Sequence, residues 1–228
     1  MPVNFIPFIY AGIFAIILVA VAPRKEIHRL ATYGMICGSI KKDRRIIMRL
    51  FVGIDLPEQL KEELAKFQSE LKQLGVKAFW KSLENFHITL EFLGELEPGN
   101  VPVISNALIK GAKQSKPYYL KVIGLGAFPS LIRPRVLWTR VSGNLIELNK
   151  LQANIHHELL EAGFTLENRA FKSHITLASR PELPEANYAD FKKRVFGEFL
   201  VSEFALIESK VIRGKRIYTS IKKIVLRD

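Results

Sequence analysis

The chain has 228 residues, of which 48% are hydrophobic, so it has enough apolar side chains to bury a core of its own. Cys37 is the single cysteine, which excludes an intrachain disulfide and a cysteine-based zinc site and suits a reducing compartment. The formal net charge of +12 favours polyanionic partners such as nucleic acid or phosphate esters, although an excess of lysine is also common on solvated surfaces.

Residues 1–47 differ from the rest of the chain and carry +5 of the net charge. Their uncharged apolar run, residues 5–22, is just long enough to span a bilayer, and the basic residues after it would keep the body in the cytoplasm. A cleaved signal peptide fits less well, because no basic region precedes the run. Alternatively, the natural chain starts at Met48 and residues 1–47 come from an over-extended start site.

We therefore divide the chain into an N-terminal extension, residues 1–47, and a body, residues 48–228, which retains a net charge of +7. The body is expected to be cytoplasmic, and to be attached to a membrane only if residues 1–47 are made.

The first half of the body predicts strands and helices in turn. "RLFVGIDL" reads as a strand, and Pro57 then opens an amphipathic helix that Gly75 stops. "KAFWKSLENFHITLEFLG" predicts a short strand, a turn at Glu84 and Asn85, and a second strand. "VPVISNALIKGAKQ" predicts a helix, and the strands "YYLKVIGLGAF" and "RVLWTRV" follow, joined by the loop "PSLIRP".

The second half repeats this order in outline. "NLIELNKLQANIHHELLEAG" predicts a helix that ends at Gly163, "SHITLAS" a strand, and "PEANYADFKKRVF" a further helix. The chain closes with two strands, "VSEFALIESKVI" and "IYTSIKKIVL", in a hairpin that turns at Gly214. Because strands and helices do not alternate strictly, we expect an α+β fold with mainly antiparallel sheets, made of two similar halves.

The tetrapeptide His-Ile-Thr-Leu occurs twice, once in each half, beginning at His87 and at His174. Side chains alternate along a strand, so His87 and Thr89 share one face, and His174 and Thr176 share one face of theirs. The Ile and Leu side chains on the other faces can fill a core. If the halves pack about a pseudo-twofold axis, the two polar pairs face each other across one central cleft.

Two imidazoles at one cleft suit proton transfer in both directions, because an unperturbed histidine has a pKa of about 6.5. One can take a proton from water while the other gives a proton to a leaving alkoxide. The hydroxyls of Thr89 and Thr176 can hold phosphoryl oxygens and stabilise the charge that develops on them. This scheme requires no metal and no cofactor. A single His-x-Thr would be read as structural. We read His28, His156 and His157 as structural or solvated.

The body resembles the 2H phosphoesterase superfamily, in particular the RNA 2′,3′-cyclic phosphodiesterases that are also called the 2′-5′ RNA ligase family. The resemblance extends over nearly all of residues 48–228 and rests on five markers in order. These are "MRLFVGIDLP", "FHITLEFLGEL", "GAFPSLIRPRVLW", "FKSHITLAS" and a closing group of Ser209, Gly214 and Tyr218.

This resemblance implies a bilobal fold with both His-x-Thr motifs in its central cleft. It implies metal-independent hydrolysis of a 2′,3′-cyclic phosphate at an RNA end to a 2′-phosphate, and an association with the reverse 2′-5′ joining of RNA. His87 and His174 then transfer protons, while Thr89 and Thr176 hold the phosphate. We take His87 as the acid and His174 as the base, and the reverse assignment stays open.

The chain departs from the family pattern after the second histidine, where Ser179 takes the position of an arginine and Arg180 follows. Arg180 would face the same side as His174 in a regular strand, or point into solvent if the strand bends before Pro181. Arg135 resembles a family position near the RNA, and Arg133 is a weaker candidate. Trp80, Phe86 and Phe171 could stack on bases, although core packing is the simpler role for each.

The expected substrate is RNA that ends in a 2′,3′-cyclic phosphate, such as a tRNA-like molecule, bound by a monomeric enzyme of RNA processing. Two other functions use the same residues. A related 2H enzyme would act on a small cyclic nucleotide, and a binding module would recognise nucleotides without turnover.

Overall fold

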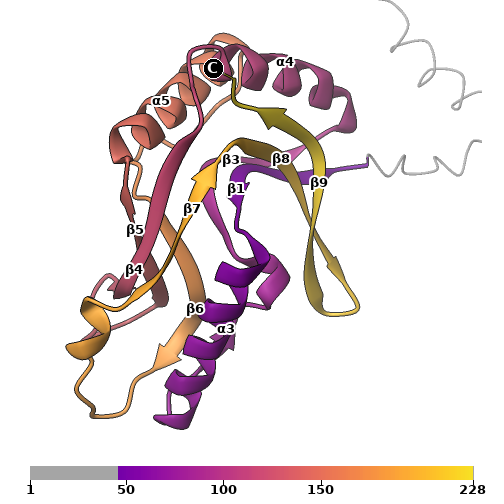
Figure 1. The fold of residues 1–228 in the computed structure, drawn as a ribbon. Coiled ribbons are helices and arrows are strands. Elements are labelled where there is room, and N and C mark those ends of the chain that lie inside the picture. The colour runs from indigo at the N-terminus through magenta and orange to yellow at the C-terminus, as the bar shows by residue number, and fades with distance from the viewer. Residues whose placement is uncertain (1–45, 228) are drawn as a thin grey trace, which may run out of the picture. The chain divides into compact units, whose positions relative to one another are not determined.

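The computed structural model describes residues 46–227 (Figure 1). The predicted apolar run at residues 5–22, together with His28 and Cys37, lies outside the described residues. Within residues 46–227, none of the helices has the length and apolar character needed to cross a membrane.

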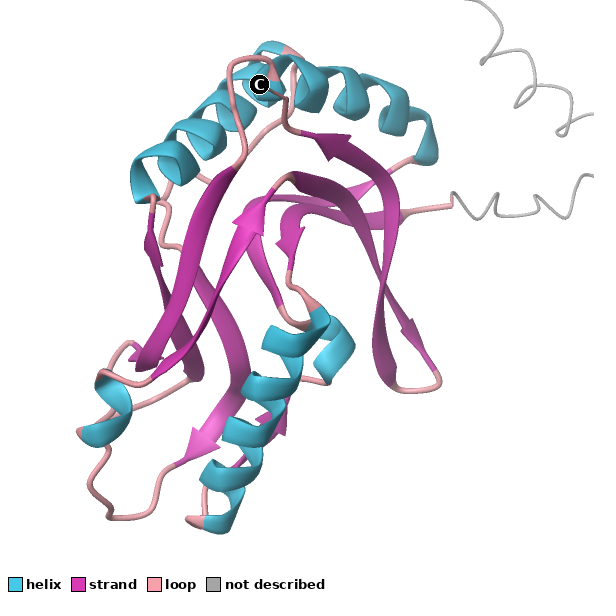
Figure 2. Ribbon diagram, in the orientation of Figure 1, coloured by secondary structure: helices cyan, strands magenta, loops and turns pink. Residues whose placement is uncertain are grey.

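The described residues form an α+β fold whose strands pair antiparallel throughout (Figure 2). The strands are β1 (Met48–Asp55), β2 (Lys77–Trp80), β3 (His87–Leu96), β4 (Tyr118–Phe128), β5 (Val136–Gly143), β6 (His174–Glu182), β7 (Val195–Val201), β8 (Glu203–Ile212) and β9 (Lys215–Val225). The helices are α3 (Glu58–Gln73), α4 (Val101–Ala112) and α5 (Leu145–Glu161), with short 3-10 turns η1 (Leu83–Asn85), η2 (Pro98–Asn100) and η3 (Asp190–Lys192).

The strands join in one nine-stranded sheet with the order β7-β4-β5-β6-β3-β1-β8-β9, and β2 pairs with β6 beside this path. Four strands thus lie on each side of the contact between β6 and β3, and each of these two strands carries one His-Ile-Thr-Leu motif. A single residue pair, Ile88 with Ile175, joins them. The sheet therefore brings the two motifs together at its middle.

The helices begin and end where the sequence predicts. Pro57 precedes α3, and Gly75, with φ of +88°, follows it. The Asn144 side chain accepts a hydrogen bond of 3.2 Å from the Glu147 backbone N–H and so caps α5. Helices α4 and α5 pack against each other at the upper end of the view, whereas α3 lies alone in its lower half (Figure 1).

One large core holds the sheet and the helices together. Helix α3 contributes Leu64, Phe67 and Leu71 to it, each with no exposed surface, at three- and four-residue steps. Ile88 and Ile175 are also fully buried and belong to the same core. The strand pair that carries the histidines is thus fixed from its apolar side.

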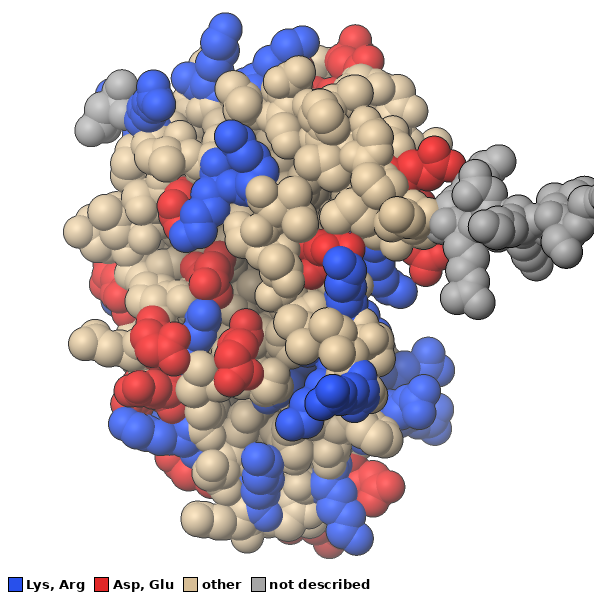
Figure 3. Space-filling view, turned by 90° about the vertical axis from the view of Figure 1, so that its right-hand side faces the viewer, with Lys and Arg blue, Asp and Glu red and all other residues tan. Residues whose placement is uncertain are grey.

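One predicted helix is wrong. Residues 184–196 hold only the 3-10 turn η3 and the start of β7, which pairs with β4 over Tyr118–Ile123. The predicted final hairpin is confirmed, because β8 and β9 pair along their length and turn at Arg213 and Gly214, both with positive φ. On the face shown in Figure 3, a group of neighbouring Lys and Arg side chains lies in the lower right part of the view.

Candidate active site

The predicted alternation along the two motif strands is confirmed. Ile88 is fully buried and Leu90 is buried, while His87 and Thr89 are partly exposed on the opposite face of β3. In β6, Ile175 and Leu177 are fully buried, while His174 and Thr176 are partly exposed. Each strand therefore anchors its polar pair by burying the apolar pair behind it.

The antiparallel register brings the polar pairs to one face. Continued by one residue on either side of Ile88 and Ile175, it sets His87 opposite Thr176 and Thr89 opposite His174. The two histidines are then diagonal neighbours, a relation that usually separates residues by about 7–8 Å. The charge of His174 contributes to the lowered pKa of His87, as expected for imidazoles this close.

Both imidazoles are held in the same way by the backbone two residues earlier. The Nδ1–H of His87 donates to the Asn85 carbonyl over 2.9 Å, and that of His174 donates to the Lys172 carbonyl over 2.7 Å. Because a carbonyl can only accept, Nδ1 carries the proton and Nε2 of the neutral ring keeps its lone pair. At His87 the Thr89 hydroxyl donates to that lone pair over 2.9 Å.

Aromatic rings form the wall around His87. The ring centroid of Phe51 on β1 lies 4.8 Å from that of His87, and Tyr218 on β9 meets His87 edge-on at 5.1 Å. Phe51, Ala205 and Ile207 form a small buried cluster on this face, against which Tyr218 packs. The apolar cluster keeps water from one side of the His87 ring.

His174 has a matching wall from the other set of four strands. Phe128 on β4 meets it edge-on at 5.0 Å, and Trp138 on β5 lies 6.3 Å away between ring centroids. Each histidine thus has its own backbone carbonyl at Nδ1 and its own pair of aromatic neighbours.

Burial lowers the pKa of both imidazoles, because the charged form loses contact with water. The pKa of His87 falls to about 4, and the nearby charge of Lys81 adds to the effect of burial. The pKa of His174 also falls, with burial as the largest cause and the charge of Arg169 adding to it. Both rings are therefore neutral in the empty site at pH 7.

Strand β6 does not stay regular to the end of its motif. Leu137 pairs with Ala178 but Trp138 pairs with Thr176, so Leu177 is an extra residue in β6, a β-bulge. The extra residue moves every side chain that follows it in β6 to the opposite face of the sheet. Ser179 rather than Arg180 therefore lies on the face of Thr176. Arg180 itself has φ of +49° and an exposed side chain, whose guanidinium lies 5.8 Å above the Phe79 ring.

The two arginines predicted to contact RNA lie next to each other. The Arg180 backbone N–H donates to the Arg135 carbonyl over 2.8 Å, which places both beyond the end of the His174 motif. Both side chains, and that of Arg133, are exposed. A contact between these arginines and RNA remains a prediction.

The side chains given structural roles lie where expected. Phe86 is fully buried, and Trp80 and Phe171 are partly buried against the core. His156 bridges to buried Glu91 of β3, with Nδ1 and Oε2 2.6 Å apart, whereas His157 is exposed.

Sequence reasoning missed the aromatic neighbours Phe51, Phe128 and Trp138, and it used Tyr218 only as a marker of resemblance. These residues come from four strands far apart in the chain, so no local pattern joins them to the histidines. Phe51, Trp138 and Tyr218 are each the single aromatic residue of their strand, whereas β4 also holds two tyrosines, so Phe128 does not stand out.

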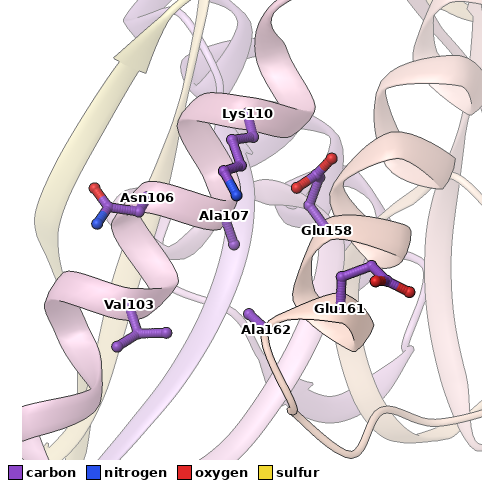
Figure 4. Close-up of a pocket in the computed structure, with 7 residues that line it drawn as sticks. All are labelled: Val103, Asn106, Ala107, Lys110, Glu158, Glu161 and Ala162. Atoms are coloured by element: carbon purple, nitrogen blue, oxygen red, sulfur yellow. The ribbon is translucent and has the colours of Figure 1, made fainter.

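A shallow hollow lies elsewhere, between α4 and α5 (Figure 4). Ala107 and Lys110 line it from one helix and Glu158 and Glu161 from the other, without any imidazole, hydroxyl or thiol. We therefore take the two histidines as the candidate active site. In residues 46–227, no three His, Cys, Asp or Glu side chains gather as a metal site would require.

Comparisons with known proteins show what this chain is similar to. The model of the LigT-like phosphoesterase family matches residues 54–138 and 142–218. The chain is 34% identical over 188 residues to the RNA 2′,3′-cyclic phosphodiesterase of Methanocaldococcus jannaschii, covering 77% of this chain and 99% of that protein. It is 32% identical over 180 residues to the protein of that name from Archaeoglobus fulgidus, covering 77% of this chain and 98% of that protein. The crystal structure of E. coli LigT complexed with 3′-AMP is similar with a TM-score of 0.67 at 25% identity, covering 80% of this chain and all 100% of that one.

Proposed function

Because this chain belongs to the LigT-like phosphoesterase family, we propose that it hydrolyses the 2′,3′-cyclic phosphate at an RNA end to a 2′-phosphate. The observation that carries the proposal is the pair of imidazoles on one face of the sheet, His87 and His174, each held at Nδ1 by a backbone carbonyl. The names of the relatives from M. jannaschii and A. fulgidus support the choice of substrate.

In the proposed reaction, Nε2 of His174 takes a proton from water and the water oxygen attacks phosphorus. The bond between phosphorus and O3′ breaks, and its electron pair stays on O3′, which receives the proton of the His87 imidazolium. The hydroxyls of Thr89 and Thr176 donate to the two non-bridging oxygens, where negative charge grows during attack. Proton exchange with solvent then restores both imidazoles.

Thr89 changes partner when substrate binds. In the empty site its hydroxyl donates to Nε2 of His87, the atom that must carry the catalytic proton. A protonated Nε2 cannot accept that hydrogen bond, so the Thr89 hydroxyl turns to a phosphoryl oxygen. Protonation of His87 and binding of the phosphate therefore favour each other.

The assignment of His87 as acid and His174 as base has a direct test. As the acid, His87 must gain its proton together with the anionic substrate, since its pKa in the empty site is about 4. His87→Ala and His174→Ala are compared on an aryl phosphodiester, whose leaving group needs no protonation. We expect His87→Ala to recover most of its lost kcat on that substrate and His174→Ala to recover little; recovery by His174→Ala instead reverses the assignment.

The function itself is tested with an RNA oligonucleotide that ends in a 2′,3′-cyclic phosphate, assayed beside a mononucleotide 2′,3′-cyclic phosphate, both with EDTA present. We expect both to yield the 2′-phosphate, and His87→Ala and His174→Ala each to lower kcat by about 10²-fold or more. Turnover of the mononucleotide alone would identify an enzyme of small cyclic nucleotides. Binding without turnover would identify a recognition module, and activity lost to EDTA would contradict the two-histidine scheme.

The same site also supports 2′-5′ joining of RNA, in which a 5′-hydroxyl replaces water and a 2′-5′ linkage forms. Each histidine then keeps its role from hydrolysis, because His174 takes the proton of the 5′-hydroxyl and His87 gives a proton to the leaving O3′. Incubating the cyclic-phosphate RNA with an excess of 5′-hydroxyl RNA tests this proposal, because a joined product must disappear in both histidine variants.

A further inference from the structure

The hairpin formed by β8 and β9 begins beside His87, where the Tyr218 ring packs edge-on against the imidazole. Residues 209–227 include no Asp or Glu, yet the hairpin end carries Lys210, Arg213, Lys215 and Arg216. Lys210 pairs with Glu208 over 2.9 Å. The other three basic side chains at this end are exposed and make no ion pair within residues 46–227.

Asn85 ties this hairpin to the catalytic histidine. Its carbonyl holds Nδ1 of His87, and its side-chain amide donates to the Arg216 carbonyl over 2.9 Å. Arg216 and Tyr218 lie two residues apart on β9 and so share one face. The Arg216 guanidinium donates to the Ser209 hydroxyl over 2.8 Å on that face. The guanidinium is therefore on the side of the hairpin that Tyr218 turns towards His87.

Lys81 adds a second cation at the same place. It follows β2, is partly buried, and its backbone N–H donates to the carbonyl of Leu177, the last residue of the second motif, over 2.9 Å. Its charge also contributes to the lowered pKa of His87. Burial and the charge of Arg216 both lower the pKa of Lys81, and no carboxylate in the described part of the chain pairs with either side chain. Two cations held together without an anion are unfavourable unless a ligand supplies the negative charge.

Apolar side chains accompany the basic ones along the hairpin. Val211, Ile212 and Ile217 are 61%, 48% and 42% exposed. From Tyr218 back to Lys215 the strand extends roughly 10 Å at about 3.3 Å per residue. A single-stranded nucleic acid fits such a surface, because its phosphates meet the cations while the faces of its bases cover the aliphatic side chains.

We propose that Lys81 and Arg216 bind the phosphodiester one nucleotide upstream of the cyclic phosphate, and that Arg213 and Lys215 bind phosphates further along the same RNA strand. This inference rests on the proposed function and adds a preference for chain length. The enzyme then favours the end of an RNA strand over a free cyclic nucleotide, because only the strand offers upstream phosphates.

The experiment compares a mononucleotide, a dinucleotide and a hexanucleotide, each ending in a 2′,3′-cyclic phosphate. We expect the wild-type kcat/KM to be about tenfold or more higher for the dinucleotide than for the mononucleotide, as for one charge-assisted phosphate contact. Lys81→Met and Arg216→Gln should bring this ratio close to one, and Arg216→Lys should restore part of it. The double variant Arg213→Gln with Lys215→Gln should lower only the increase in kcat/KM from the dinucleotide to the hexanucleotide.

Salt dependence gives an independent measurement. For the hexanucleotide, the slope of log kcat/KM against log salt concentration should fall by about 0.7 for each phosphate contact removed. Lys113→Gln, which removes an exposed lysine beyond the end of α4, is the matched control and should leave the ratios and slope unchanged. Thermal unfolding of each variant shows whether the fold is kept.

The possible failures are distinguishable. If none of the three substrates is hydrolysed, the proposed function is wrong. If all three are hydrolysed with equal kcat/KM, the function stands and the upstream phosphate sites are overturned. Unchanged kcat/KM ratios and salt slopes in the hairpin variants would also overturn the upstream phosphate sites. That result is expected if the hairpin binds an acidic protein surface instead.

Discussion

At the scale of single residues, the site is built from backbone atoms as much as from side chains. The carbonyls of Asn85 and Lys172 fix the tautomer and the orientation of the two imidazoles, so each presents Nε2 to the shared face. The aromatic walls then lower the pKa of both rings by excluding water. In the proposed reaction the bound phosphate supplies the anion that draws a proton onto one ring.

The pH dependence of the reaction follows from these two shifts. In the free enzyme the base must be neutral and the acid protonated, and both pKa values lie below the ordinary value of about 6.5. We therefore expect kcat/KM to reach its maximum below pH 6.5 and to fall as the pH rises through neutrality. A bound anion favours imidazolium and raises both pKa values, so the maximum of kcat should lie at higher pH than that of kcat/KM. Rate profiles between pH 4 and pH 9 measure both; a maximum of kcat/KM above pH 7 would contradict the lowered pKa values.

Strand alternation was enough to predict that the His and Thr of each motif share a face, because residues 87–89 and 174–176 lie in regular strand. The same reasoning could not decide the position of Arg180, since the bulge at Leu177 exchanges the faces. Nothing in the local sequence marks that bulge. The carbonyl partners of the imidazoles were also out of reach, because the sequence does not tell where a backbone oxygen points.

At the scale of elements, β1 and β3 approach each other closely beside His87. A Cβ on Gly53 would lie 3.1 Å from the Ile88 carbonyl oxygen, 3.2 Å from the Phe51 ring and 3.5 Å from Cδ2 of His87. The carbonyl belongs to the strand pair that joins the two motifs, so it cannot move without moving His87. Glycine at this position lets β1 lie close to the Ile88 carbonyl, next to His87 in the chain.

We expect Gly53→Ala to lower kcat by about tenfold or more, because the backbone next to His87 must shift and a small displacement of a reacting group is costly. Overpacking should also lower the free energy of unfolding by about 1–3 kcal/mol. Gly99→Ala is the control, since a Cβ there would meet nothing within 4 Å. Steady-state kinetics and urea unfolding measure the two effects, and full activity of Gly53→Ala would show that the contact is not needed.

The predicted helix at residues 184–196 shows where element prediction fails. Its sequence is rich in residues that helices tolerate, yet the Tyr188 hydroxyl donates to the Pro184 carbonyl and the Asn187 side chain accepts from the Ala189 backbone N–H, which fix a loop. Strand β7 then buries Phe196, Phe199 and Val201 and pairs with β4. Pairing with a strand more than 70 positions earlier overrides the local propensity for a helix. This pairing is visible only in the fold.

At the scale of the whole molecule, the core and the proposed catalytic machinery belong to one unit. Residues 46–228 form one compact unit. The buried core cluster extends from Leu50 to Leu226, and β1 begins at Met48. Ile46 and Ile47, which precede β1, are 73% and 54% exposed, so they bury little surface against the unit.

A chain that begins at Met48 should therefore fold and keep its activity. We expect its Tm and its kcat/KM for cyclic-phosphate RNA to equal those of the full chain, because the two described residues that the truncation removes, Ile46 and Ile47, are exposed. The control is a chain that begins at Asp55, which lacks most of β1 and with it the buried residues Leu50, Val52 and Ile54. Loss of strand β1 separates β3 from β8, so this shorter chain should not fold. A lower kcat/KM for the Met48 chain at an unchanged Tm would instead assign residues 1–47 a part in binding RNA, which their five net positive charges would explain.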